Sequence, residues 1–288
     1  MARRNYEKLT VEAFGRQLIT TGDLDPVYVM LVGTQLEEPQ LARWLIAYWC
    51  LYHCGSASYI SEAEGAAFWE RLMEAATNLK PNPLGGRWPR GHERRHFRGR
   101  QGYASVYELS RAYPTPEKMI QFLAQPTADG LAQLPFQTVA DRAQTHRGFG
   151  PWMAFKIADM LERVLGVSVD FDQSTVFMFK DPVKAALMLW RQRMDFQSYA
   201  QPNNRADVLN WVVGLLQEEF KDLKAPPTRD RPIGVQEIET VLCKHKSHLS
   251  GHYPLWNDTD EISAGLNEWS RCSETAGLLL KHLPEHSV

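Results

Sequence analysis

Apolar positions recur every three or four residues along most of this chain, which is the spacing of amphipathic α-helices. No stretch alternates convincingly between apolar and polar positions, as a half-buried strand would. We therefore predict an all-α protein. The expected helices cover residues 7–20, 39–54, 61–78, 103–112, 115–125, 128–143, 151–165, 173–190, 205–222, 234–245 and 258–282. The prolines fall mostly between these segments, where a missing N–H and a fixed φ do least damage.

Two long irregular stretches, 80–103 and 224–234, interrupt the helical array. Loops of this length in compact proteins are more often functional than decorative. With 288 residues, the chain is long enough for one large domain or two modest ones. We expect a single helical unit over residues 1–288, with a division into two lobes as the alternative.

Composition limits the classes of partner. The formal net charge of -2 gives no global reason to expect a polyanion, so a nucleic-acid role must rest on local clusters of charge. The most apolar run, "WLIAYWCLY", lies between Arg43 and His53 and is far shorter than the ~20 residues that span a bilayer. The four cysteines are too few and too scattered for a disulfide framework. We expect a soluble cytoplasmic protein with reduced thiols, no signal peptide and no membrane partner.

The segment "THRGFG" (145–150) joins the predicted helices 128–143 and 151–165 into a helical hairpin. Gly148 and Gly150 accept positive φ without strain, and Pro151 suits the first turn of a helix. Such a turn leaves backbone N–H groups free at a helix N-terminus, where the dipole favours an anion such as a DNA phosphate. From the glycine spacing alone, an ordinary interhelical loop is an equally good interpretation.

The aspartate that follows the hairpin, Asp170, favours a DNA-binding hairpin over an ordinary interhelical loop. The order "HRGFGPWMA", a helix, and then Val169-Asp170 resembles the helix-hairpin-helix DNA glycosylase superfamily. The resemblance implies a glycosylase-like helical fold with a cleft for DNA, and it makes Asp170 the catalytic carboxylate beside a base flipped out of the duplex. It implies DNA-backbone contacts from the hairpin, namely Gly148, Phe149, Gly150 and Lys156.

Two neighbouring positions refine the expected chemistry. Trp152 occupies the place of the lysine nucleophile of bifunctional glycosylases, so Schiff-base lyase chemistry is not expected. Trp152 is instead a candidate for the base or nucleophile pocket. Asp172 is a second candidate catalytic carboxylate, although it equally suits a helix cap before Gln173.

Residues 87–100 form an arginine-rich segment, which we call the arginine loop. Six arginines are interleaved with two histidines and two aromatic residues, and only Glu93 opposes them. Guanidinium groups match phosphate oxygens in bidentate fashion, so this segment is expected to bind DNA backbone or pyrophosphate. A solvated basic loop is the alternative. The phosphate-binding candidates here are Arg87, Arg90, Arg94, Arg95 and Arg98.

Two further clusters supply candidates. In "EIETVLCKHKSHLSGHY" (237–253), Lys244 and Lys246 are candidate phosphate ligands, and Glu239 and His248 are candidates for the pocket. A zinc site of Cys243, His248 and His252 is conceivable, but this spacing fits no standard pattern, so we predict no metal ligands. An ordinary surface helix ending at a glycine turn is the alternative. In "YHCGSAS", His53 and Ser56 are pocket candidates, whereas the nearby aromatic stripe equally suits the core.

Together, "DLDPVY", "YHCGSAS", the arginine loop, "GFGPWMAFKIADMLERVLGVSVDFD" and "EIETVLCKHKS" resemble one branch of this fold over residues 20–270. That branch is the alpha-glutamyl/putrescinyl thymine pyrophosphorylases, or amino acid:DNA transferases, of bacteriophages. The resemblance implies a double-stranded DNA substrate whose 5-hydroxymethyluracil carries a pyrophosphate. An amino acid or polyamine would attack the exocyclic methylene and expel pyrophosphate.

The resemblance also implies the setting of this reaction. We expect a monomer in the cytoplasm of the phage's host, and Mg²⁺ assistance to pyrophosphate departure stays open because no ligand motif stands out. A monofunctional DNA glycosylase is the alternative enzyme, and it requires only the hairpin and Asp170. A non-catalytic DNA-binding scaffold requires the hairpin alone. Transfer is favoured because positive side chains stabilise a departing polyanion.

Overall fold

The computed structural model describes residues 5–127, 130–171, 180–193 and 205–285. The chain forms two compact units. The larger unit comprises Val27–Val169 and Thr259–Leu283. The smaller unit comprises Met1–Pro26, Asp170–Asp258 and Pro284–Val288. Each unit is built mainly from helices, and each has its own buried apolar residues.

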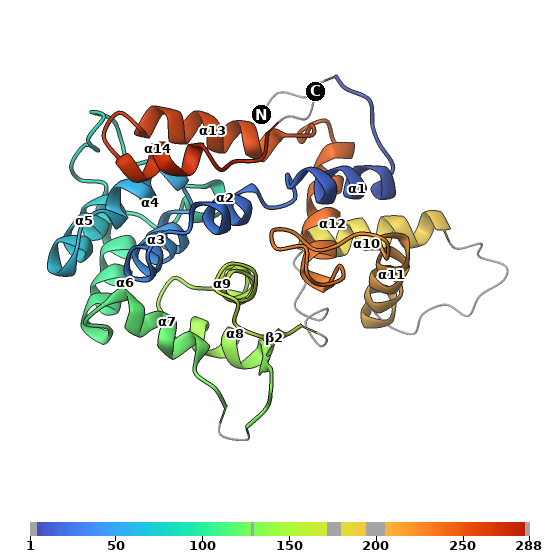
Figure 1. The fold of residues 1–288 in the computed structure, drawn as a ribbon, viewed down its shortest axis with the longest axis horizontal. Helices are drawn as coiled ribbons and strands as arrows, with labels where there is room; N and C mark the ends of the chain where they lie inside the picture. The colour runs from blue at the N-terminus through green and yellow to red at the C-terminus, as the bar shows by residue number, and fades with distance from the viewer. Residues whose placement is uncertain (1–4, 128–129, 172–179, 194–204, 286–288) are drawn as a thin grey trace. The chain divides into compact units, whose positions relative to one another are not determined.

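Helices from both ends of the chain build the larger unit. Within it, α3 packs on α4 and α7, α5 packs on α6, and α8 packs on α9. The late helix α14 packs on the early helix α4 (Figure 1). Glu62 ties these two segments together, because its Oε1 accepts hydrogen bonds from Ser273 Oγ at 2.7 Å and Thr275 N at 2.8 Å. The elements are α2 (Pro26–Thr34), α3 (Glu38–Leu51), α4 (Cys54–Ser61), α5 (Gly65–Thr77), a 3₁₀ turn η1 (His92–Arg94), α6 (Gly99–Ala112), α7 (Pro116–Ala124), β1 (Leu134–Pro135), α8 (Phe136–Gln144), α9 (Pro151–Arg163), β2 (Val169–Asp170), α13 (Asn257–Trp269) and α14 (Glu274–Leu280).

The smaller unit packs four described helices around one core. These are α1 (Val11–Thr21), α10 (Lys180–Arg193), α11 (Arg205–Glu219) and α12 (Val235–Leu249). Helix α12 contacts α1, α10 and α11. Gly15 lets α1 approach closely, because a Cβ at this position would lie 2.6 Å from Phe220 Cζ and 2.9 Å from Val241 Cγ1.

Local sequence signals explain where several helices begin and end. Thr10 caps α1, since its hydroxyl accepts a hydrogen bond from Ala13 N, and Gly22 closes the helix with φ of 82°. Pro151 begins α9. Ser273 caps α14 by accepting a hydrogen bond from Ala276 N at 3.1 Å. This cap divides the region predicted as one helix, 258–282, into α13 and α14.

The predicted all-α class is confirmed, and the described strands are limited to the short pair β1 and β2. Some boundaries were wrong. Helix α2 was missed because "PVYVMLVGT" is apolar on every face and shows no helical period. The stretch 39–54 ends earlier, since Tyr52 has φ of 53° and breaks α3 before α4. Helix α8 begins only at Phe136, after β1, rather than at 128. Residues 173–179 lie outside the described residues.

Among the described helices, none has the length and apolar character needed to cross a membrane.

Candidate active site and DNA interface

The hairpin predicted from the glycines is present as α8, a tight turn and α9. Gly148 has φ of 82°, and a Cβ there would lie 3.1 Å from both Phe97 Cε2 and Ser105 Oγ. Gly150 does not use the positive φ that glycine permits, because its φ of -86° and ψ of -177° are extended. A Cβ on Gly150 would meet nothing within 4 Å. Conformation and space therefore both demand glycine at 148 and neither demands it at 150.

This asymmetry predicts different stabilities for two alanine variants. Gly148→Ala should lower the free energy of unfolding by about 1–2 kcal/mol, through positive-φ strain and crowding. Gly150→Ala should change it by less than about 0.5 kcal/mol, since the site is open. Urea denaturation of both variants checks the prediction, and equal losses in the two variants would contradict it.

The hairpin turn borders a hollow on the surface of the larger unit. A shallow hollow of about 500 Å³ lies over the turn. The first bond of α9 is Ala154 N to Gly150 O, and no side chain among the described residues caps this helix. Its first amides therefore have no partner within the helix, and the dipole favours a negative charge there. The hollow is lined by His96, Glu108, Gln144, Thr145, His146, Arg147, Gly148, Phe149 and Gly150.

Two of the predicted DNA-backbone residues point elsewhere. The Phe149 side chain is buried, at 3% exposure. Lys156 is also buried, and its Nζ lies 3.8 Å from Asp159 Oδ2. Gly148 and Gly150 are thus the predicted contacts that the geometry favours, while the geometry favours a structural role for Lys156.

Arg94 holds the hairpin turn from inside. Its side chain is 2% exposed, and its Nη1 donates to Gly148 O at 2.7 Å while its Nε donates to Cys50 O at 3.2 Å. The guanidinium also lies over the rings of Phe97 and Phe149, at 4.4 and 5.4 Å from their centroids. Burial lowers the pKa of Arg94 to about 10, so it stays charged at neutral pH. The geometry favours a structural role over the predicted phosphate contact.

The other arginines of the arginine loop differ in how far their side chains are exposed to solvent. Arg90 is half-buried and donates to Phe97 O and Ala75 O, and burial lowers its pKa, with Arg98 adding to the effect. The Nη1 of Arg95 donates to His92 Nε2 at 2.7 Å and is exposed. The exposed arginines, which remain available to a phosphate group, are Arg87, Arg95, Arg98 and Arg100.

An aromatic ladder brings Trp152 to the predicted pocket segment. Trp44 stacks on Tyr48 with ring centroids 4.9 Å apart, Tyr48 contacts Tyr52 at 4.6 Å, and Tyr52 meets Trp152 edge-on at 4.9 Å. Trp44 is fully buried, whereas Tyr52 and Trp152 are partly exposed. The ladder therefore runs from the core to the surface at the start of α9, beside His53.

His53 and Ser56 contact each other at the start of α4. Nδ1 of His53 accepts a hydrogen bond from Ser56 N at 3.0 Å and lies 3.1 Å from Ser56 Oγ. Burial lowers the pKa of His53 to about 4. At neutral pH the ring is therefore uncharged, and because Nδ1 accepts a backbone N–H, the proton sits on Nε2. His53 can donate a hydrogen bond but is a poor general acid.

The lowered pKa of His53 makes stability depend on pH. The unfolded histidine titrates near pH 6.5, so between pH 6.5 and about 4 the unfolded state binds more protons than the folded state. Stability should therefore fall as pH drops through this window. His53→Asn keeps a capping acceptor but cannot titrate, so its decline should be shallower. Urea midpoints at pH 7 and pH 5 test this, and an unchanged decline in the variant would contradict it.

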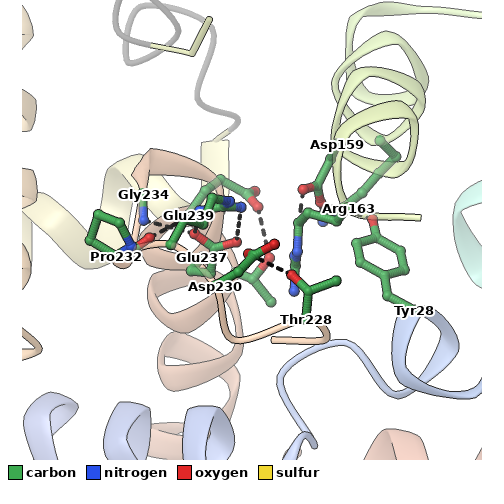
Figure 2. A network of polar contacts seen from close by, with 12 residues as sticks. Tyr28, Asp159, Arg163, Thr228, Asp230, Pro232, Gly234, Glu237 and Glu239 are labelled. Carbon is green, nitrogen blue, oxygen red and sulfur yellow. Dashed lines mark hydrogen bonds and ion pairs between the residues drawn. The ribbon is translucent and has the colours of Figure 1, made fainter. Parts of the chain in front are cut away.

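A buried charged set on α9 was missed by the sequence reasoning. Asp159 is fully buried and accepts a hydrogen bond from Tyr28 OH at 2.8 Å, and its Oδ1 lies 3.4 Å from Arg163 Nη1 (Figure 2). Lys156, Asp159 and Arg163 lie three and four residues apart within an apolar helix. The sequence could have revealed this set, because charged residues spaced three and four apart within an apolar helix lie on one face. Charges on a buried face are rarely found unless they are paired.

Asp170 is the last residue of β2, which pairs with β1. Val169 and Phe171 are buried, at 3% and 6% exposure, while Asp170 is intermediate. Because side chains alternate along an extended strand, Asp170 points away from the face that buries its two neighbours. Asp172, the second predicted carboxylate, lies outside the described residues.

Most of the candidate site residues on α12 make hydrogen bonds or ion pairs within the smaller unit. Lys244 Nζ donates to Asp23 O at 2.9 Å and pairs with Asp258 Oδ2 at 2.9 Å. His248 uses both ring nitrogens, since Nε2 accepts from Leu9 N and Nδ1 donates to Tyr253 O. Lys246 is partly exposed and pairs with Asp181 at 2.7 Å. Glu239 is 3% exposed. These contacts favour structural roles for Lys244 and His248.

The start of α12 holds a second buried carboxylate. Glu237 is fully buried, and Arg231 binds both its oxygens, at 2.8 and 3.0 Å. Glu237 Oε2 also accepts a hydrogen bond from Gly234 N at 2.8 Å (Figure 2). This bidentate pair anchors the loop 224–234 to α12. Within the described residues, no group of three or more histidine, cysteine, aspartate or glutamate side chains is arranged to hold a metal ion.

Comparison with known proteins places this chain in a family. The family described as amino acid:DNA transferase matches residues 19–253, which is most of the chain. The chain belongs to the amino acid:DNA transferase family. It is therefore a transferase of DNA base modification, as the sequence motifs predicted.

Two relatives of this transferase come from bacteriophages. A protein named glycinyltransferase, from Pseudomonas phage PaMx11, is 47% identical over 293 residues that cover 98% of both chains. A protein named putrescinyltransferase, from Delftia phage PhiW-14, is 27% identical over 267 residues that cover 92% of this chain and 79% of the relative. The transferase thus has similarity to proteins named for two chemically different amine donors.

Proposed function

We propose that this transferase joins glycine to a pyrophosphorylated 5-hydroxymethyluracil in DNA. The observation that carries the choice of glycine is the 47% identity to a glycinyltransferase across 98% of both chains. The similarity to a putrescinyltransferase is much lower, at 27%. Glycine carries a carboxylate that putrescine lacks, so discrimination between the two rests on the charge of the pocket.

The proposed reaction is a substitution at the exocyclic methylene carbon of the base. The glycine ammonium first loses a proton, and its nitrogen lone pair then forms a C–N bond to the methylene. The C–O bond to pyrophosphate breaks, and pyrophosphate leaves with the electron pair. The new secondary ammonium loses a further proton to reach the neutral amine. Catalysis therefore needs a proton acceptor for the amine and cations for the leaving group.

Residues of the chain match these needs. Asp170, partly exposed at the end of β2, is the proposed proton acceptor. Three of the exposed arginines of the arginine loop, Arg87, Arg95 and Arg98, are the proposed ligands of the pyrophosphate. The amides at the start of α9 and the turn at Gly148 are the proposed contacts to the DNA backbone. Tyr52, Trp152 and His53 are proposed to face the extruded base.

The test is a reaction of purified protein with duplex DNA that contains the pyrophosphorylated base, together with isotopically labelled glycine. We expect a nucleoside that carries one labelled glycine, joined through its nitrogen to the methylene in place of the pyrophosphate, and one pyrophosphate released for each base modified. Putrescine supplied in place of glycine should give much less product. Preferential incorporation of putrescine would overturn the choice of glycine.

The same assay separates transfer from base excision. A monofunctional glycosylase would release free base and leave abasic sites, which alkali converts to strand breaks. Abasic sites without incorporated glycine would therefore contradict the proposal.

A further inference from the structure

Helix α6 carries an exposed stripe of two arginines and two tyrosines. Arg100, Tyr103, Tyr107 and Arg111 follow one another at intervals of three and four residues, so they share one face of the helix. All four are exposed, and the two tyrosines keep 46% and 47% of their surface in solvent. Their rings are stacked, with centroids 5.8 Å apart and an interplanar angle of 13°. We call this set the tyrosine stripe.

The opposite face of α6 explains why the stripe faces outward. Gly102, Ser105, Val106 and Leu109 are buried on that face. Gly102 has no room for a side chain, because a Cβ would lie 2.6 Å from Ala76 O. The helix is therefore fixed in rotation, and its tyrosines are held away from the core of the larger unit.

Helix α6 also borders the hairpin turn. Ser105 Oγ lies 3.1 Å from the position that a Cβ on Gly148 would occupy. Glu108, next to Tyr107 in the chain, lines the hollow over the turn and pairs with Arg147 at 3.2 Å. The tyrosine stripe thus lies on the helix that packs against the proposed DNA-binding turn.

The chemistry of the stripe matches unpaired nucleotides. Exposed aromatic rings provide faces on which bases stack, and arginines at both ends of the stripe suit the phosphates. The faces of bases inside a duplex are already stacked, so a duplex would use only the arginines. Arg111 lies eleven positions after Arg100 on the helix, a rise of about 16 Å, which is long enough to meet several nucleotides.

We propose that the tyrosine stripe binds a single-stranded segment of DNA beside the hairpin. This inference rests on the proposed function insofar as DNA is the substrate. It adds a second contact for nucleic acid, outside the residues proposed to perform the transfer. Single-stranded character next to the target base would then favour binding.

The test uses the full-length protein and a fluorescein-labelled 15-mer of deoxythymidine, with a duplex of mixed sequence as the second probe. Fluorescence anisotropy should show that Tyr103→Ala/Tyr107→Ala weakens binding of the single strand about tenfold or more. The duplex affinity should change less than threefold. Tyr103→Phe/Tyr107→Phe keeps the ring faces and should bind the single strand like the native protein.

Folding and specificity are controlled in the same experiment. Leu278→Ala removes another exposed apolar side chain, on α14, and should leave both affinities unchanged. Equal melting temperatures for the double alanine variant and the native protein should establish that the fold is intact, since both rings are exposed.

Several results would overturn the inference. Single-strand affinity that is unchanged in the double alanine variant would do so. Loss of self-association in that variant without loss of single-strand binding would identify a protein contact instead. Failure of the glycine assay leaves this inference standing if single-strand binding still depends on the tyrosines. Conversely, active glycine transfer without tyrosine-dependent binding of the single strand would overturn the role of the tyrosine stripe and leave the proposed function standing.

Discussion

Asp170→Asn is expected to lower the rate of glycine transfer by about 10²–10⁴-fold, because an amide cannot accept the proton of the incoming ammonium. The two side chains have nearly the same shape, and Asp170 is only partly buried, so the fold should persist. Single-turnover mass spectrometry of the modified nucleoside measures the rate. DNA affinity, measured by anisotropy on the same duplex, should change much less than the rate.

A matched control keeps this result interpretable. Asp222→Asn makes the same chemical change on the surface of the smaller unit, where Asp222 pairs with Arg16 at 2.7 Å. This control should transfer glycine at the native rate. A native rate in Asp170→Asn would show that Asp170 is not the proton acceptor. The buried carboxylates Asp159 and Glu237 would then be the next residues to test for this role.

Local signals made the fold class and the hairpin predictable. The three-to-four residue period, the prolines and the order of Gly148, Pro151 and Val169-Asp170 depend only on neighbours in the chain. Helix α2 escaped prediction because a helix that is apolar on every face has no amphipathic period. The sequence could not tell which of the two glycines has positive φ, since glycine permits positive φ without requiring it.

The roles of the charged residues were harder to predict because burial depends on contacts between distant segments. Arg94 and Arg87 look alike in the sequence, yet Arg94 reaches Cys50 O and Gly148 O inside the larger unit, while Arg87 is exposed. Lys244 and His248 likewise meet Asp23 and Leu9, more than 200 residues away. Charge density marked the arginine loop in the sequence but did not indicate which of its arginines hold the fold.

A large loss of stability is expected when the buried Arg94 is replaced, but not when the exposed Arg87 is replaced. Arg94→Met should lower the free energy of unfolding by about 2–4 kcal/mol, because the buried carbonyl of Cys50 and the partly buried carbonyl of Gly148 lose their donors. Arg94→Lys should also be destabilised, since a single ammonium does not reproduce the fork that reaches both Cys50 O and Gly148 O. Arg87→Met, in the same loop but exposed, should change stability by less than about 0.5 kcal/mol. Urea denaturation monitored by tryptophan fluorescence gives all three values.

The two arginines should also differ in what they do to the reaction. Arg87→Met should slow the release of pyrophosphate while the protein stays folded, because it removes a cation available to the leaving group. Arg94→Met should weaken DNA binding in proportion to the loss of the turn at Gly148, which Arg94 supports from within. Recovery of stability and activity by Arg94→Lys would instead mean that the positive charge alone matters at position 94. A single ammonium at this position would then be enough to support the carbonyls of Cys50 and Gly148.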